Sequence, residues 1–173
     1  MNTDTFYAIL AGICFALCGL WWTVVENRKD WLKDTQLRSL AGGVYASFLV
    51  PGVMSLGAQI GGSNTLVWRS VFVIAALVGM FYTFRLLARI SKMGGGGFYT
   101  RTRWLVILVY TVVLVLGVFP KLVVPTGLTA IQVEAFCVCF IVLSGHGLAW
   151  EMMTTHKPET TPSKESGGPS STV

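Results

Sequence analysis

The sequence has few charged residues. Only 12% of its 173 residues are Asp, Glu, Lys or Arg, whereas 53% are hydrophobic. A soluble domain carries about 25% charged residues, so this chain lacks enough of them to cover a globule of its size with a wetted surface. The shortage argues against a soluble protein and favours one that is surrounded by lipid.

The polar segments contain no cysteine. Cys14, Cys18, Cys137 and Cys139 all lie within apolar stretches, which argues against a disulfide framework of the secreted kind. Zinc needs four convergent ligands, and this spacing offers at most two from one helix, so we expect no metal and no cofactor. A basic segment is also missing before the first apolar run, whereas a cleaved signal peptide needs one. We therefore expect this run to stay in the mature protein.

Recognised catalytic motifs are absent as well. The sequence has no Walker loop, no G-x-S-x-G, no H-E-x-x-H, no C-x-x-C and no dinucleotide-binding fingerprint. We therefore assign no catalytic residue, and we favour a protein that is not an enzyme.

Long apolar runs are what the sequence does have. A helix that crosses a bilayer needs about 20 mostly apolar residues, and the runs lack the period-two alternation of a membrane β-barrel. We predict an all-α fold, a bundle of five transmembrane helices that forms one domain over residues 1–156. The predicted spans cover residues 6–25, 40–60, 66–90, 104–124 and 127–150. Residues 157–173 are too poor in apolar side chains to order and should form a disordered tail.

The basic residues gather on one side of the predicted spans. Of 13 Lys and Arg, only Arg69 and Lys121 fall on the other side. Because an excess of Lys and Arg marks the cytoplasmic side, we predict that the N-terminus lies outside and the C-terminus lies in the cytoplasm. The membrane would be the plasma (inner) membrane. The net charge of +5 then reflects topology, and no nucleic-acid partner is expected.

One group of basic residues brackets the GGGG stretch at 94–97. Such clusters can hold the headgroups of anionic lipids, although they can also serve only to set the topology. The candidate headgroup ligands are Arg85, Arg89, Lys92, Arg101 and Arg103.

Glu134 interrupts the apolar run IQVEAFCVCF at 131–140. A charged group there costs about 2.5–3.5 kcal/mol on insertion scales, so the side chain should face protein. We predict that Glu134 either pairs with Arg69, at the outer end of the third span, or is held in its neutral, protonated form by burial. The functional interpretation is a proton or cation site, and the structural one is a buried pair that fixes helix register.

The second predicted span is rich in small residues. Small residues let helix backbones approach closely in lipid, so this span should lie at the centre of the bundle. Pro51 stands near its middle and leaves one carbonyl without a donor, which predicts a kink in the helix.

Three functions remain open. In length and number of spans the chain resembles translocator-protein-like membrane proteins, but no motif residue matches, so the resemblance assigns no site. The first hypothesis is a small non-enzymatic membrane protein, acting as a homo-oligomer or an accessory subunit of a membrane complex, that lines a transport pathway for an ion or small solute. The second is a membrane-embedded enzyme acting on a lipid at the cytoplasmic interface, using His146, Glu151 and the Arg85/Arg89 cluster. The third is an adaptor whose tail, ending in STV, recruits a partner.

These hypotheses predict different cavities. Transport predicts a polar tunnel that reaches Glu134. Lipid catalysis predicts that His146 and a carboxylate converge within hydrogen-bond reach in a cavity on the cytoplasmic side.

Overall fold

The regular structure of the chain is helical. The computed structural model describes residues 3–62, 64–91 and 98–155, and no strand occurs among them. The elements are α1 (Thr3–Asn27), α2 (Lys29–Lys33), α3 (Thr35–Gly61), α4 (Thr65–Ser91), α5 (Phe98–Val118), the 3₁₀ helix η1 (Pro120–Thr126) and α6 (Ala130–Thr155). The predicted all-α fold is confirmed. The predicted tail, 157–173, lies outside the described residues.

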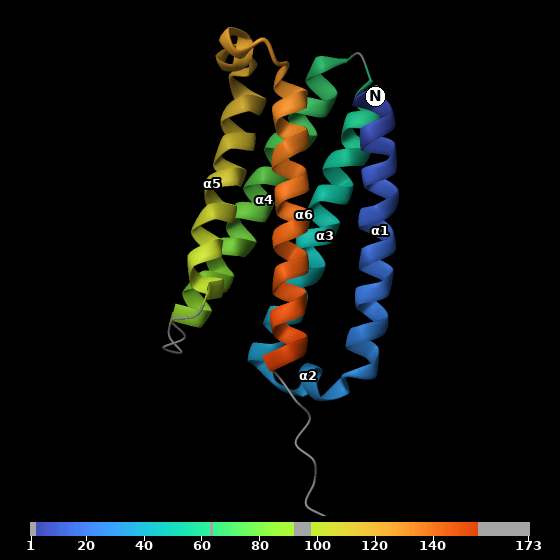
Figure 1. The fold of residues 1–173 in the computed structure, drawn as a ribbon, viewed down its shortest axis with the longest axis vertical. Coiled ribbons are helices and arrows are strands. Elements are labelled where there is room, and N and C mark those ends of the chain that lie inside the picture. The colour runs from blue at the N-terminus through green and yellow to red at the C-terminus, as the bar shows by residue number, and fades with distance from the viewer. Residues whose placement is uncertain (1–2, 63, 92–97, 156–173) are drawn as a thin grey trace, which may run out of the picture.

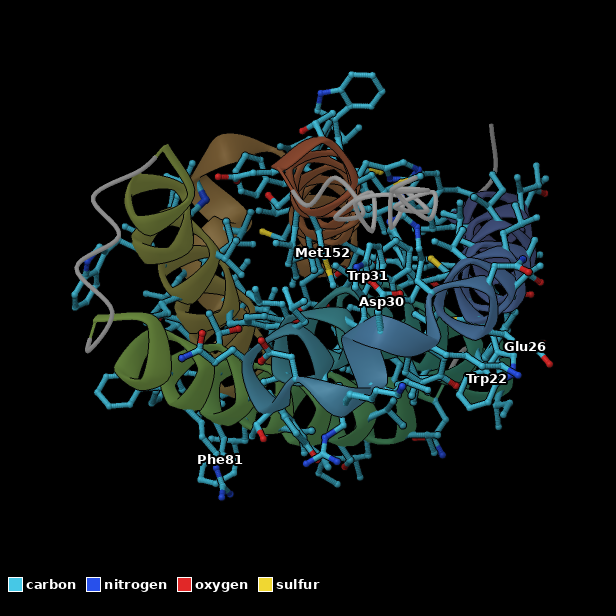
Figure 2. All side chains as sticks on the ribbon, turned by 90° about the horizontal axis from the view of Figure 1, so that it is seen from below. Trp22, Glu26, Asp30, Trp31, Phe81 and Met152 are labelled. Carbon is cyan, nitrogen blue, oxygen red and sulfur yellow. The ribbon has the colours of Figure 1, made fainter. Side chains whose placement is uncertain are left out.

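Four of the described helices are long and apolar enough to cross a membrane, namely α1, α3, α4 as far as Arg85, and α6. In α5 the corresponding apolar stretch, Trp104–Val118, is shorter. Large apolar side chains cover the outward faces: Trp22 is 66% exposed and Phe81 60%, and both rings point away from the bundle (Figure 2). Such faces suit lipid rather than water.

Helix α3 lies at the centre of the bundle. It packs against α1, α4 and α6, whereas α5 packs against α4 and α6. Figure 1 shows the long helices side by side, with α2 and the C-terminal end of α6 at the lower end and η1 at the upper end. The central place expected for the second span is confirmed.

The ends of α3 follow from local chemistry. The Asp34 side chain precedes the helix and accepts hydrogen bonds from the backbone N–H groups of Gln36 at 2.6 Å and Leu37 at 3.3 Å, which makes it an N-cap. The helix therefore begins at Thr35, before the predicted start at residue 40. It ends where Gly62 takes a φ of 46°, in the left-handed region that glycine favours.

The boundaries on either side of η1 also differ from those predicted. Helix α5 ends at Val118 instead of continuing to residue 124, because Pro120 has no N–H and disfavours a helical conformation in the residue before it. Helix α6 begins at Ala130 instead of 127. Gly127 has a φ of 73°, so the chain is still turning at that residue.

The connection between α1 and α3 is more ordered than the sequence indicated. It contains the short helix α2, whose Trp31 is 0% exposed. The Trp31 and Trp21 rings lie 6.1 Å apart, and the Trp21 indole donates to the Ala41 carbonyl oxygen at 2.9 Å. Figure 2 shows Trp31 at the middle of the lower end.

Pro51 stands inside α3, which continues on both sides of it. The Ser47 hydroxyl donates to the Val44 carbonyl oxygen at 2.6 Å, and the Ser55 hydroxyl donates to that of Pro51 at 2.8 Å. The kink at Pro51 stays a prediction.

Candidate functional site

A cavity of about 680 Å³ lies between α3, α4, α5 and α6. Helices α4 and α6 both pack against α3, and α5 packs against both of them, so the four helices surround this space. The lining residues belong to the first half of α3, the first half of α5 and the second halves of α4 and α6. The cavity therefore occupies the lower half of the bundle in Figure 1.

The cavity walls combine apolar side chains with hydroxyl groups. The apolar lining includes Val50, Leu105, Val106, Phe140, Ile141, Leu143 and Leu148. The hydroxyl groups belong to Ser39, Ser47, Tyr82, Thr83, Tyr110 and Ser144. An apolar enclosure with a few polar groups is typical of a small-molecule site.

Two of the lining hydroxyl groups donate their hydrogens within their own helices. Ser47 donates its hydrogen to the Val44 carbonyl oxygen at 2.6 Å, and Thr83 donates to that of Gly79 at 2.7 Å. Because a hydroxyl has one hydrogen and two lone pairs, both oxygens remain able to accept. They would be the acceptors for a bound molecule that donates a hydrogen bond.

Charged side chains line the lower end of the cavity. Arg85, near the end of α4, is exposed, and Glu151, near the end of α6, is half-buried. Arg85 belongs to the predicted headgroup cluster. Lys92 and the side chains of Arg89, Arg101 and Arg103 lie outside the described part of the chain, so lipid binding by this cluster stays a prediction.

Glycines in the lining leave free volume in the cavity. A Cβ built on Gly42 or Gly147, both in the lining, would meet no atom within 4 Å. Beside them, a Cβ on Gly145 would lie only 2.9 Å from the Ser47 Cβ. The helices α3 and α6 therefore touch at one point and leave space at others.

The residues proposed for lipid catalysis do not converge. The His146 Nδ1 atom lies 3.0 Å from the Val142 carbonyl oxygen, and the ring packs against Phe48 with centroids 5.1 Å apart. Glu151 lines the cavity, but His146 is not in the lining. The described contacts of the imidazole are thus with its own helix and with α3.

Glu134 lies in the upper half of the bundle. It is 0% exposed, and among the described residues neither carboxyl oxygen has a hydrogen-bond partner. The cavity lining on α6 begins at Phe140, which is about 9 Å further along the helix at 1.5 Å per residue. The predicted tunnel to Glu134 is therefore not formed by this cavity.

Arg69 does not form the predicted hydrogen-bonded pair with Glu134. Its Nε donates to the Gly117 carbonyl oxygen at 2.7 Å and its Nη2 to that of Val118 at 2.8 Å. These carbonyls are at the end of α5, where the helix supplies no donors of its own. Arg69 is near enough for its charge to act on Glu134, but its described hydrogen bonds go to α5.

The four cysteines are free, with Cys14 and Cys18 buried and Cys137 and Cys139 half-buried. Among the described residues, no three His, Cys, Asp or Glu side chains come together as metal ligands would.

These features define a helical protein with several helices able to cross a membrane and a cavity inside the bundle. No protein-family model matches the chain, and no curated protein or solved structure matches it. Its function is therefore inferred from the residues that surround the cavity.

Proposed function

We propose that this chain is a five-span protein of the plasma membrane that binds a small amphipathic solute, without reacting with it, in the cavity between α3, α4, α5 and α6. The observation that carries the proposal is the cavity itself. Its volume of about 680 Å³ falls within the range of about 300–1,000 Å³ that is usual for ligand sites.

The length of α5 supports a fifth crossing. Its 21 residues extend about 31 Å at 1.5 Å per residue, close to the hydrocarbon thickness of about 30 Å. It packs along α4 and α6, which are themselves long and apolar enough to cross.

The distribution of basic residues supports a cytoplasmic C-terminus. Arg28, Lys29 and Lys33 belong to the connection at the lower end, whereas Lys121 belongs to η1 at the upper end. Since Lys and Arg favour the cytoplasmic side, the lower end would face the cytoplasm. The cavity would then open toward the cytoplasm, between Arg85 and Glu151.

The lining indicates which solute would fit. Val50, Val106 and Ile141 would contact an apolar body, and the oxygens of Ser47 and Thr83 would accept a hydrogen bond from it. An alcohol or amide with a medium-length apolar chain has both features. The arrangement favours binding over lipid catalysis, because His146 is outside the lining. Oligomerisation, subunit assembly and recruitment through the tail stay predictions.

Photoaffinity labelling tests this proposal. The probe is a medium-chain alcohol that carries a photoreactive diazirine, added to the full-length protein in lipid nanodiscs, with the labelled peptides identified by mass spectrometry. We expect labelling to concentrate on the cavity segments of α3 and α6. Substituting Gly42→Leu should reduce it about tenfold, because the new side chain would occupy the cavity without meeting an atom near its Cβ.

Gly12→Leu is the matched control. Gly12 is also a helical glycine whose Cβ would meet nothing within 4 Å, but it lies on α1, which does not line the cavity. Labelling of this variant should equal that of the unaltered protein. Unchanged labelling in Gly42→Leu, or labelling concentrated on outward residues such as Trp22 and Phe81, would reject the binding cavity.

A further inference from the structure

Glu134 is a buried acid for which the described structure offers no donor. Its side chain is 0% exposed, and both carboxyl oxygens lack a hydrogen-bond partner. An ionised carboxylate in that position would have lost its hydration without gaining a hydrogen bond, whereas the neutral acid loses far less hydration free energy. The geometry therefore fits a carboxyl group that carries a proton.

Two donors at this end of the bundle, Tyr7 and Arg69, bond to other groups. The Tyr7 hydroxyl of α1 donates to the Ile131 carbonyl oxygen at 2.8 Å. The Arg69 guanidinium donates from Nε and Nη2 to the carbonyl oxygens of Gly117 and Val118. A guanidinium has five N–H donors in a planar fork that also fits a carboxylate. Arg69 could thus serve either partner, and in this structure it serves α5.

Few other groups at this end of the bundle could influence the acid. The outer half of α3, 48–61, contains no titratable side chain, and the outer half of α5, 108–118, contains only Tyr110. The titratable or charged groups at this end on the other elements and on α6 itself are Asp4, Tyr7 and Cys14 on α1, Arg69 on α4, Lys121 on η1, and Cys137 and Cys139 on α6. Arg69 is the cation whose charge acts on Glu134.

We propose that Glu134 is a reversible proton-binding site and that Arg69 is its counter-ion once the proton has left. When Glu134 is protonated, Arg69 donates to the carbonyl oxygens of Gly117 and Val118 at the end of α5. On release, the carboxyl O–H gives its proton to water at the outer end of the bundle, and the carboxylate takes over the Arg69 hydrogen bonds from Gly117 and Val118. No electron is transferred, and Arg69 keeps its charge.

Release of the proton would therefore change the hydrogen bonding at the outer surface. The last turn of α5 would lose two charge-assisted hydrogen bonds, and η1 follows that turn directly. This site is separate from the solute cavity, whose lining on α6 begins at Phe140. The proposal therefore does not depend on what the cavity binds.

Infrared spectroscopy of the full-length protein in lipid nanodiscs tests proton binding. The difference between the unaltered protein and Glu134→Gln, recorded from pH 5 to pH 9, isolates the carbonyl stretch of this one carboxyl group. We expect a band of a protonated carboxyl at neutral pH that declines as the pH rises. In Arg69→Gln the decline should move upward by about one pH unit or more, because the carboxylate would lack its counter-ion.

Two results would overturn the proton site. One is the absence of the protonated band throughout the pH range, which would mean that Glu134 is ionised. The other is a decline at the same pH in Arg69→Gln as in the unaltered protein, which would remove Arg69 as the counter-ion. Circular dichroism and size-exclusion chromatography establish that both variants keep the helical fold. Glu134→Gln should do so, because glutamine has the size of the neutral acid.

Hydrogen–deuterium exchange tests the movement of Arg69. After correction for the intrinsic pH dependence of exchange, the amides in the last turn of α5 should exchange at least about threefold faster above the infrared midpoint, because that turn loses its carbonyl partner. In Glu134→Gln the corrected rate should stay constant with pH. An equal acceleration in both proteins would mean that Arg69 does not exchange between α5 and Glu134.

Discussion

Gly57 in the upper half of the bundle and Gly42 in the lower half have opposite surroundings. In the upper half, a Cβ on Gly57 of α3 would lie 2.7 Å from the Cβ of Val71 on α4, so the absence of a side chain lets the two helices touch. In the lower half, Gly42 and Gly147 face the cavity, and a Cβ there would meet nothing within 4 Å. A small residue in a membrane helix therefore indicates either close packing or open space.

Polar groups differ between the halves in the same way. In the upper half Glu134 is enclosed and without a partner. In the lower half Ser47 and Thr83 line the cavity, and each donates its hydroxyl hydrogen within its own helix. Glu134 in the upper half is thus shielded from solvent, whereas Ser47 and Thr83 in the lower half line a cavity that a solute would enter.

The largest expected effect comes from filling the upper contact. Gly57→Leu would force a side chain into Val71, whose Cβ belongs to the rigid part of that residue, so α3 and α4 would have to separate. Overpacking of this kind costs up to about 3 kcal/mol. The free energy of unfolding can be measured by titration with SDS in mixed micelles, followed by circular dichroism. Gly42→Leu is the control, and an equal loss in both variants would contradict the difference between the halves.

Removal of the Arg69 side chain should have the next largest effect. Arg69→Gln deletes two charge-assisted hydrogen bonds to the end of α5, and we expect a loss of about 2 kcal/mol in the same titration. Arg69→Lys keeps the charge but cannot form the same fork, so it should recover only part of the stability. Full stability in Arg69→Gln would mean that the end of α5 needs no donor from α4.

Tyr7→Phe should have a smaller effect. The substitution removes one hydroxyl, which donates to the Ile131 carbonyl oxygen at 2.8 Å and joins α1 to α6. A hydrogen bond between membrane helices contributes about 0.6 kcal/mol on average, so a loss of about 1 kcal/mol or less is expected by SDS titration. Tyr82→Phe is the comparison, since Tyr82 is 57% exposed. A loss as large in Tyr82→Phe would assign the effect to something other than the Ile131 bond.

The smallest effect is a gain. Gly42→Ala adds one methyl group where there is room for it, and alanine favours the helix by about 0.5 kcal/mol over glycine. The same substitution at Gly57 should be destabilising. If thermal denaturation gave both variants a shift of the same sign, the two glycines would not differ in their surroundings.

The sequence predicted the helices well because each depends on one local property. An apolar run of sufficient length must be helical in lipid, and the small residues of the second span correctly indicated the centre of the bundle. The ends were harder to predict. The extension of α3 back to Thr35 depends on a cap from Asp34, and Trp31 is buried although it lies among charged neighbours.

The candidate site could be predicted only in part. The burial of Glu134 followed from the cost of exposing an acid to lipid, and it agrees with the structure. The sequence did not predict that Arg69 would donate to α5 instead of to Glu134, because the hydrogen bonds of Arg69 depend on where α5 ends relative to α4. Two of the hypotheses predicted a cavity, but apart from Arg85 and Glu151 neither predicted the residues that line the one observed. Its residues come from four helices, and the space between them depends on which helices are neighbours. No single segment of the sequence contains that information.

The buried ring of Trp31 has a practical consequence for mapping the topology. A reporter inserted between the first two long helices would pull this indole out of its surroundings and disturb the assembly being probed. Gly62 and Gly127 are exposed, and a Cβ on either would meet nothing within 4 Å. Epitopes or glycosylation acceptors placed at these two turns would report which side of the bilayer they occupy while leaving the helices intact.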